Sequence, residues 1–252
     1  MEHYSWNELN QNNINIDLNI HNIQNNIELS KYAEEFQHKY IPVYDSILIL
    51  EHFIIKDGIE KNDILKDIYE SFYQNSGCLI IKNVFPVELI ESYNQYLNKY
   101  PNDDILLKMS ENNPQLLLKL LNNCIINIFI DNLLGFGKIG SCTTNSNLID
   151  NMNNPVDFNK IKRLFTRTQI NSILPYYSLE VLIAIDKMDI RNGSLEIIPG
   201  SHDINDIDVL IHNKDIFSKL EKHFVNVSLN KGDVLIFNRG ICYREGNNIS
   251  NN

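Results

Sequence analysis

The chain has 252 residues, a formal net charge of −10 and four cysteines. This length is enough to bury a large core, so one domain with a helical annex is expected. The acidic charge argues against nucleic acid or an anionic membrane as a partner. The cysteines form no Cys-x-x-Cys pair, no apolar run is long enough to span a membrane, and the N-terminus lacks a signal pattern. We therefore expect a cytoplasmic location.

The first part of the chain is rich in asparagine and isoleucine, as is the rest of the sequence. We attribute this bias to AT-rich coding DNA and not to a functional tract. Residues 7–28 alternate polar and apolar positions, which suits a strand, but their low complexity suits disorder equally well. We expect 1–30 to be a low-complexity segment and 31–252 to be a single domain.

A helical part is predicted at about 60–135. Apolar residues recur at helical spacing over 63–74, and Gly77 ends that helix before a buried strand at 78–85. Pro86 opens a second helix that runs to about Lys99, at a position where its missing N–H costs nothing. A long apolar helix is predicted from about Pro114 to Leu134.

Beyond residue 138 the pattern changes to short strands separated by Asn, Pro and Gly turns. A helix around 213–222 interrupts them, and such spacing is typical of an all-β sandwich or jelly roll. The predicted strands are 138–144, 163–173, 179–187, 194–199, 223–229, 233–237 and 240–244. The expected fold class is therefore α+β, with a helical N-terminal half packed on a β part at about 138–252.

Two stretches of the β part carry a specific pattern. Asn192-Gly-Ser-Leu-Glu-Ile-Ile-Pro-Gly-Ser-His202 is followed some way downstream by Gly232-Asp-Val-Leu-Ile-Phe237. Together they resemble the core of the phytanoyl-CoA dioxygenase family, whose members are iron(II)/2-oxoglutarate oxygenases built on a double-stranded β-helix. A weaker match covers 72–99. The resemblance implies a cupin-like double-stranded β-helix as the core of this protein.

The resemblance also implies where iron(II) would bind. Such oxygenases hold the metal with two histidines and one carboxylate, and the open positions take 2-oxoglutarate and oxygen. In the family the first histidine and the carboxylate form a His-x-Asp on the strand that we place at 163–173. Gln169 and Asn171 occupy those positions here, and a register two residues earlier gives Arg167 and Gln169.

The second histidine of the family follows the Gly-Asp-x-x-x-Phe motif, and Tyr243 stands at that position. The assignment is framed by family matches on both sides, with Gly246, Asn248 and Ser250 after it. Neutral amides and a protonated phenol bind divalent iron weakly. The family's 2-oxoglutarate-anchoring arginine lies on a later strand, which we expect to be absent or truncated here, since Arg244 is the last basic residue. We therefore expect no catalytic residues and no cofactor.

Other side chains could form a replacement site. Arg167, Arg239 and Arg244, together with Tyr177, could line a pocket at the mouth of the β-helix and bind a small organic anion. The alternative is that the arginines are ordinary strand-edge charges and the tyrosine a core residue with a hydrated hydroxyl.

His202 is the remaining candidate for a metal ligand. Asp203, Asp206 and Asp208 follow it closely. The histidine of this motif does not bind iron in the resembled family, so we expect a solvated surface loop in preference to a metal site.

Three functions remain open. The leading interpretation is a phytanoyl-CoA dioxygenase-like protein that has lost iron/2-oxoglutarate chemistry and acts as a binding or structural module. The second is an active iron(II)/2-oxoglutarate-dependent dioxygenase that hydroxylates a small molecule or acyl substrate with non-standard ligands. The third is a structural, virion-associated jelly-roll protein.

Overall fold

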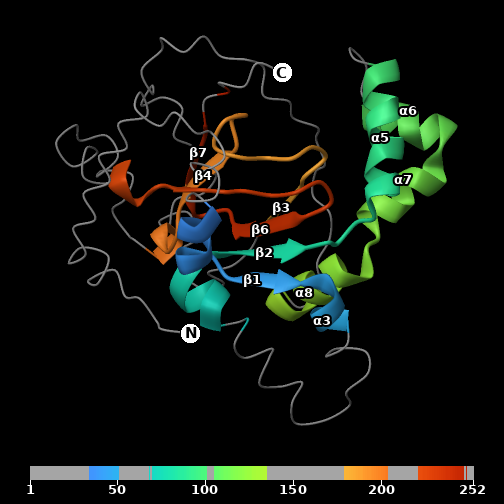
Figure 1. Ribbon diagram of the computed structural model, residues 1–252. Helices are drawn as coiled ribbons and strands as arrows, with labels where there is room; N and C mark the ends of the chain where they lie inside the picture. Colours follow the sequence, from blue (N-terminus) through green and yellow to red (C-terminus); the bar gives the residue numbers. More distant parts are fainter. Residues whose placement is uncertain are drawn as a thin grey trace.

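The computed structural model describes residues 34–50, 68, 70–100, 105–134, 179–203, 221–246 and 248. The strands of this part form a four-stranded sheet with the order β1-β2-β6-β3 and a three-stranded sheet with the order β5-β4-β7 (Figure 1). Their bounds are Val43–Asp45 (β1), Cys78–Lys82 (β2), Leu179–Ile183 (β3), Leu195–Ile198 (β4), Val225–Asn226 (β5), Val234–Asn238 (β6) and Cys242–Glu245 (β7).

The two sheets share one hydrophobic core. Alternate residues of a strand point to opposite faces, so each sheet contributes one set of side chains to the space between them. Ile80 and Leu235 of the larger sheet join Ile197 and Val225 of the smaller sheet in a single buried cluster. This facing pair of sheets is the double-stranded β-helix core of the predicted α+β fold.

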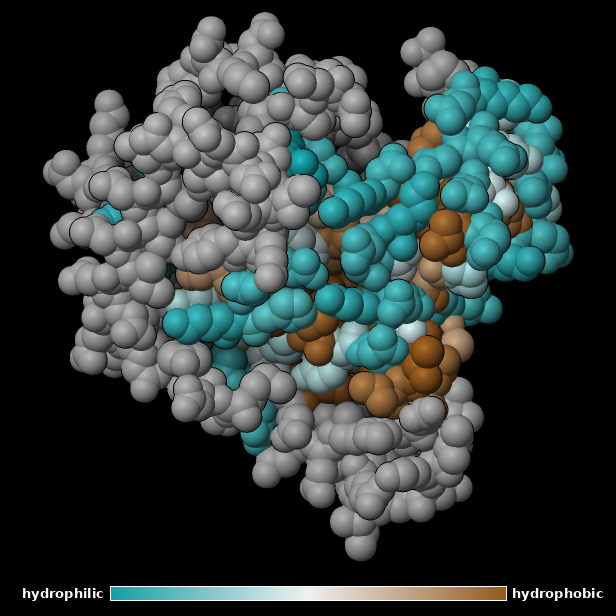
Figure 2. All heavy atoms as spheres, viewed as in Figure 1, coloured by the Kyte–Doolittle hydropathy of each residue, from teal (hydrophilic) through white to brown (hydrophobic). Residues whose placement is uncertain are grey.

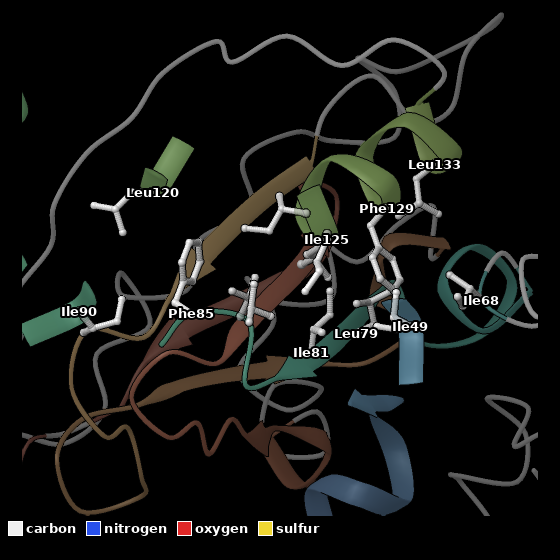
Figure 3. Close-up of a cluster of buried hydrophobic side chains, with 14 of the residues drawn as sticks. Ile49, Ile68, Leu79, Ile81, Phe85, Ile90, Leu120, Ile125, Phe129 and Leu133 are labelled. Carbon is white, nitrogen blue, oxygen red and sulfur yellow. The ribbon is translucent and has the colours of Figure 1, made fainter. Parts of the chain in front are cut away.

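Helices cover the other face of the four-stranded sheet. α3 (Ser46–Leu50) and α8 (Cys124–Leu134) lie side by side next to β1, while α5 (Val87–Lys99), α6 (Ile105–Asn112) and α7 (Pro114–Leu121) form a group at the side of the sheet. Figure 3 shows Ile125 and Phe129 of α8 directed toward the strand that carries Leu79 and Ile81. β2 and β6 are therefore buried on both faces, and for this reason they read as continuous apolar runs.

Exposed hydrophobic side chains are concentrated on the helices. The largest exposed fractions are 61% for Ile47 and 57% for Leu48, both on α3, and Figure 2 shows hydrophobic surface over the helical part among largely hydrophilic surroundings. Among the described helices, none combines the length and the apolar character that crossing a bilayer requires.

The predicted start of α5 is confirmed, but the predicted single helix over 114–134 is wrong. The chain breaks at Asn122 and Asn123, which separate α7 from α8. The side-chain oxygen of Asn123 accepts hydrogen bonds from the backbone N–H groups of Ile125 (2.9 Å) and Ile126 (3.3 Å). Asparagine satisfies the unpaired donors at a helix start, so this pair favours a new helix over continuation.

The N-terminal half of the chain also contributes strands to the β-helix. β1 and β2 come before α5, α6, α7 and α8 in the chain. They nevertheless supply two of the four strands of the larger sheet. β2 pairs in antiparallel fashion with β6, with Cys78 opposite Phe237 and Ile81 opposite Val234. A fully buried strand needs hydrogen-bonding neighbours on both sides, and for β2 these are β1 and β6.

The remaining strand predictions fall into two groups. The predicted strands at 179–187, 194–199, 223–229, 233–237 and 240–244 correspond to β3 through β7, each within shorter or shifted bounds. The predicted strands at 138–144 and 163–173 and the segment 1–30 lie outside the described residues. So does most of the helix predicted around 213–222, whose last two residues begin the short 3₁₀ helix η6 (Glu221–His223).

Candidate functional site

Tyr243, which the sequence analysis aligns with the family's second histidine, lies at the end of the sandwich where β6 leads into β7. Tyr243 is half-buried and packs against the cluster between the two sheets. Its ring meets that of Phe237 nearly edge-on, with the ring centroids 5.6 Å apart and the planes at 66°. The side chain thus faces the space between the two sheets.

A charged pair shares this end of the interior. Glu180 of β3 lies directly opposite Phe237 in the antiparallel register. Directly opposed residues project on the same face, so Glu180 belongs to the inner face of the sheet. Its Oε1 atom is 3.0 Å from Nε of Arg239, which follows β6 immediately. An ion pair and two aromatic rings therefore come together here.

Arg244 lies on the other face of β7, although it directly follows Tyr243. Its Nε donates to Oε2 of Glu196, and its Nη1 is 3.4 Å from Oε1 of Glu221. The guanidinium carbon also lies 4.1 Å from the centre of the Phe224 ring. The residue is only 7% exposed. The expectation that Arg244 helps to form an anion pocket at the mouth is not supported by this geometry, because strand alternation directs the side chain away from the interior.

His202 is a packing residue in the structure, and the expected solvated loop does not apply to it. The ring is buried, and Nε2 lies 2.9 Å from the backbone oxygen of Tyr73 in the π-helix η3 (Glu70–Ser76). A carbonyl only accepts, so Nε2 must carry the proton and is not placed to bind a metal. A Cβ atom at Gly77 would overlap the ring, and Gly77 has a φ of 72°.

The same motif fixes the end of the π-helix more generally. The backbone N–H of Gly200 donates to the oxygen of Ser76 at 2.7 Å. Together with the His202 contact, this satisfies carbonyl groups that a helix terminus leaves without partners. The Pro-Gly-Ser-His stretch therefore has a structural reason to exist that is independent of metal binding. Asp206 and Asp208 lie outside the described residues.

The turn before β4 is held by a buried carboxylate. Asp189 accepts from the backbone N–H of Arg191 (2.9 Å) and pairs with its Nη2 at 2.7 Å. Burial of the Asp189 carboxyl raises its pKa, but the hydrogen bonds and charge of Arg191, with the charge of Lys187, outweigh burial and leave the pKa lowered. The side chain of Asn192 also accepts from the Asp189 backbone at 2.8 Å. These bonds fix the Asn-Gly turn beside β7.

The described residues do not fit iron(II). Imidazole and carboxylate groups hold this metal, whereas Tyr243, the residue that we align with the second histidine, is a phenol whose ring packs on Phe237. Across the described ranges, no three His, Cys, Asp or Glu side chains are grouped so that they could hold a metal ion. Gln169, Asn171, Arg167 and Tyr177 lie outside these ranges, so their predicted roles stay predictions.

Glu180 is the site residue that the sequence analysis missed. It is the one charged residue of β3, between Leu179 and Val181. The signal was available, because a carboxylate at an inward-facing position of an apolar strand needs a partner. Finding it required the strand register, which decides which alternate positions face inward.

The facing sheets define a double-stranded β-helix protein, and its solved relatives are distant. The epimerase SnoN from nogalamycin biosynthesis, described as non-heme and alpha ketoglutarate dependent, is 14% identical, with a TM-score of 0.47 over 75% of this chain and 79% of that one. The carbocyclase SnoK, with the same description, is 16% identical, with a TM-score of 0.46 over 73% and 79%.

Sequence comparison finds relatives of the C-terminal part of the chain. The phytanoyl-CoA dioxygenase family profile matches residues 164–252. The dioxygenase lolE1 of Epichloe uncinata is 36% identical over 67 residues, which are 26% of this chain and 26% of that protein. The match thus spans about a quarter of the length of this relative. The C-terminal part of the chain is thus similar to the phytanoyl-CoA dioxygenase family.

Proposed function

We propose that the protein is a phytanoyl-CoA dioxygenase-like module that no longer performs iron/2-oxoglutarate oxygenation and instead binds a small ligand or serves a structural role. The observation that carries the proposal is the packing of Tyr243 against Phe237 inside the β-helix, at the position of the family's second histidine. A protonated phenol is a poor ligand for divalent iron.

Two further features support this proposal. Gln169 and Asn171 are the residues that we align with the family's His-x-Asp, and both are neutral amides. Arg244 pairs with Glu196 and Glu221 on the outer face of β7. Two neutral amides would not supply the imidazole and carboxylate ligands that iron(II) requires, and Arg244 is held away from the interior.

An anaerobic calorimetric titration of iron(II) into chelator-stripped protein, with and without 2-oxoglutarate, tests the proposal. We expect no binding up to hundreds of micromolar metal, and no conversion of 2-oxoglutarate to succinate in air. Tyr243→His and Tyr243→Phe form a matched pair, since only the first adds an imidazole at this position. Stoichiometric binding of iron(II) by the unaltered protein, tightened by 2-oxoglutarate, would refute the proposal.

The second candidate function is an active iron(II)/2-oxoglutarate-dependent dioxygenase with non-standard ligands. The observation that favours it is the resemblance to a protein that is itself named a dioxygenase. Under this alternative, metal binding would be unaffected by Tyr243→Phe, because the ligands would lie elsewhere. Turnover of 2-oxoglutarate that survives this substitution would select the second candidate over the first.

A further inference from the structure

The sequence contains a single Asn-Gly pair, Asn192-Gly193, which lies in the turn before β4. Asparagine is a chemically labile residue, and a following glycine has no side chain to shield its backbone nitrogen. We propose that Asn192 is a site of intramolecular deamidation, and that the folded turn prevents this reaction until the turn opens. The inference does not rest on the proposed function, because it concerns a covalent change in the scaffold.

The reaction consumes only water. The backbone nitrogen of Gly193 attacks Cγ of Asn192 and forms a new C–N bond. The bond from Cγ to the side-chain nitrogen breaks, and that nitrogen leaves as ammonia, which carries away the proton of the Gly193 N–H group. Water then opens the cyclic imide at one of its two carbonyl carbons. Position 192 becomes either an aspartate or an isoaspartate, whose backbone runs through the former side chain.

The contacts of the turn oppose this cyclisation. Oδ1 of Asn192 accepts from the backbone N–H of Asp189 at 2.8 Å, and Nδ2 donates to the backbone oxygen of Lys187. Asn192 also forms an isolated β-bridge with Asn248, and Gly193 is buried. Cyclisation changes the torsion angles of the Asn192 side chain and backbone, so these contacts must open first. The rate in the folded protein is therefore limited by local opening of the turn.

The products do not fit the closed turn. In an aspartate, oxygen would replace Nδ2 beside the Lys187 oxygen, so two acceptors would meet where a hydrogen bond now forms. The new negative charge would also lie on the residue that binds the backbone of Asp189, whose own carboxylate is buried. An isoaspartate lengthens the backbone by one carbon and shifts the bridge to Asn248. A chain that deamidates while it is open therefore cannot rebuild the same turn.

Peptide mass spectrometry tests the inference by measuring amide loss at Asn192 in the full-length protein at neutral pH. We expect the loss to be at least about tenfold slower in the folded chain than in guanidinium chloride, because folded molecules react only during local opening. Asp189→Asn removes the carboxylate that pairs with Arg191 in this turn. It should accelerate the reaction of the folded chain about fivefold, which is the equivalent of one lost hydrogen bond.

Asp186→Asn is the matched control, because it makes the same change at a side chain that is 77% exposed. It should leave the folded rate unaltered, and in guanidinium chloride all chains should react at one rate. Thermal unfolding checks that each variant is folded. If Asp189→Asn is unfolded, Arg191→Gln replaces it, since this change also removes the side-chain pair with Asp189.

The inference is overturned if the folded and unfolded chains lose the amide at equal rates, or if the unfolded chain does not lose it. Equal folded rates for Asp189→Asn and Asp186→Asn would also overturn it. The claim about the products has its own measurement. Asn192→Asp should lower the midpoint of urea unfolding more than Asn98→Asp, which makes the same change at an exposed residue of α5. Equal shifts would show that the turn accepts the product.

Discussion

Tyr243 and Arg244 are neighbours in β7, yet their side chains lie on opposite faces of the three-stranded sheet. Tyr243 packs against Phe237 between the sheets, and Arg244 pairs with Glu196 and Glu221 outside them. Because Arg244 is held on the outer face, β7 is fixed in the register that directs Tyr243 inward. The outer ion-pair network therefore helps to determine which residue of β7 faces the space between the sheets.

Replacement of Arg244 should be strongly destabilising. Arg244→Met leaves the carboxylate of Glu196, which is 21% exposed, without its partner, and we expect the free energy of unfolding to fall by about 3 kcal/mol. Urea denaturation followed by circular dichroism measures this change. Lys108→Met is the matched control, since it breaks the exposed Lys108–Glu111 pair and should cost less than about 1 kcal/mol. Equal losses in both variants would contradict a special role for Arg244.

The break between α7 and α8 depends on one side chain. Asn123→Ala removes the oxygen that accepts from Ile125 and Ile126, so we expect a loss of about 1 kcal/mol in unfolding free energy. Asn127→Ala removes only an exposed side-chain hydrogen bond from α8 to Asn122 and should change stability by no more than about 0.5 kcal/mol. The cap assignment fails if chemical denaturation gives the two variants the same stability.

The Asp189 carboxylate makes stability depend on pH. Its pKa in the folded protein is lower than the ordinary value of 3.8, so ionised Asp189 stabilises the fold. This contribution is fully present above the pKa of the unfolded chain and is lost as the pH falls toward the lower folded pKa. We expect the stability difference between the unaltered protein and Asp189→Asn to narrow between about pH 6 and about pH 3. Urea titrations at both values measure it, and a constant difference would disprove the linkage.

Gly77 and His202 should be energetically coupled. Gly77→Ala places a Cβ atom against the His202 ring at a positive φ, and we expect a cost of about 2 kcal/mol. In Gly77→Ala/His202→Ala the ring is gone, so the double variant should be more stable than the sum of the single changes predicts. A double-mutant cycle from urea denaturation gives the coupling, and strict additivity would exclude the contact.

Local signals predicted the elements whose ends are marked by special residues. Pro86 marked the start of α5, and Gly77 marked the point where the chain turns into β2. The Asn122–Asn123 break was not predicted, because asparagine is so frequent in this chain that one more pair carries little information. Its effect comes from the bonds that Asn123 makes with its own helix.

The part of the candidate site that depends on long-range strand pairing could not be predicted from the sequence. The inward position of Tyr243 followed from motif alignment, whereas the opposite directions of Arg239 and Arg244 did not. Glu180 became recognisable only once its register with Phe237 was known. Such a register depends on residues far apart in the sequence, and no local pattern specifies it.

The placement of β2 between β1 and β6 also constrains how the chain is made. Asn83, just after β2, bonds to Asp233, just before β6, across a separation of 150 residues. On the ribosome, the apolar strand Cys78–Lys82 therefore emerges long before the strand that completes its hydrogen bonds exists. During that interval its backbone hydrogen-bonding groups are unpaired and its apolar side chains are exposed, which favours aggregation. We therefore expect chaperones to bind the nascent chain. We also expect chains truncated before residue 234 to aggregate.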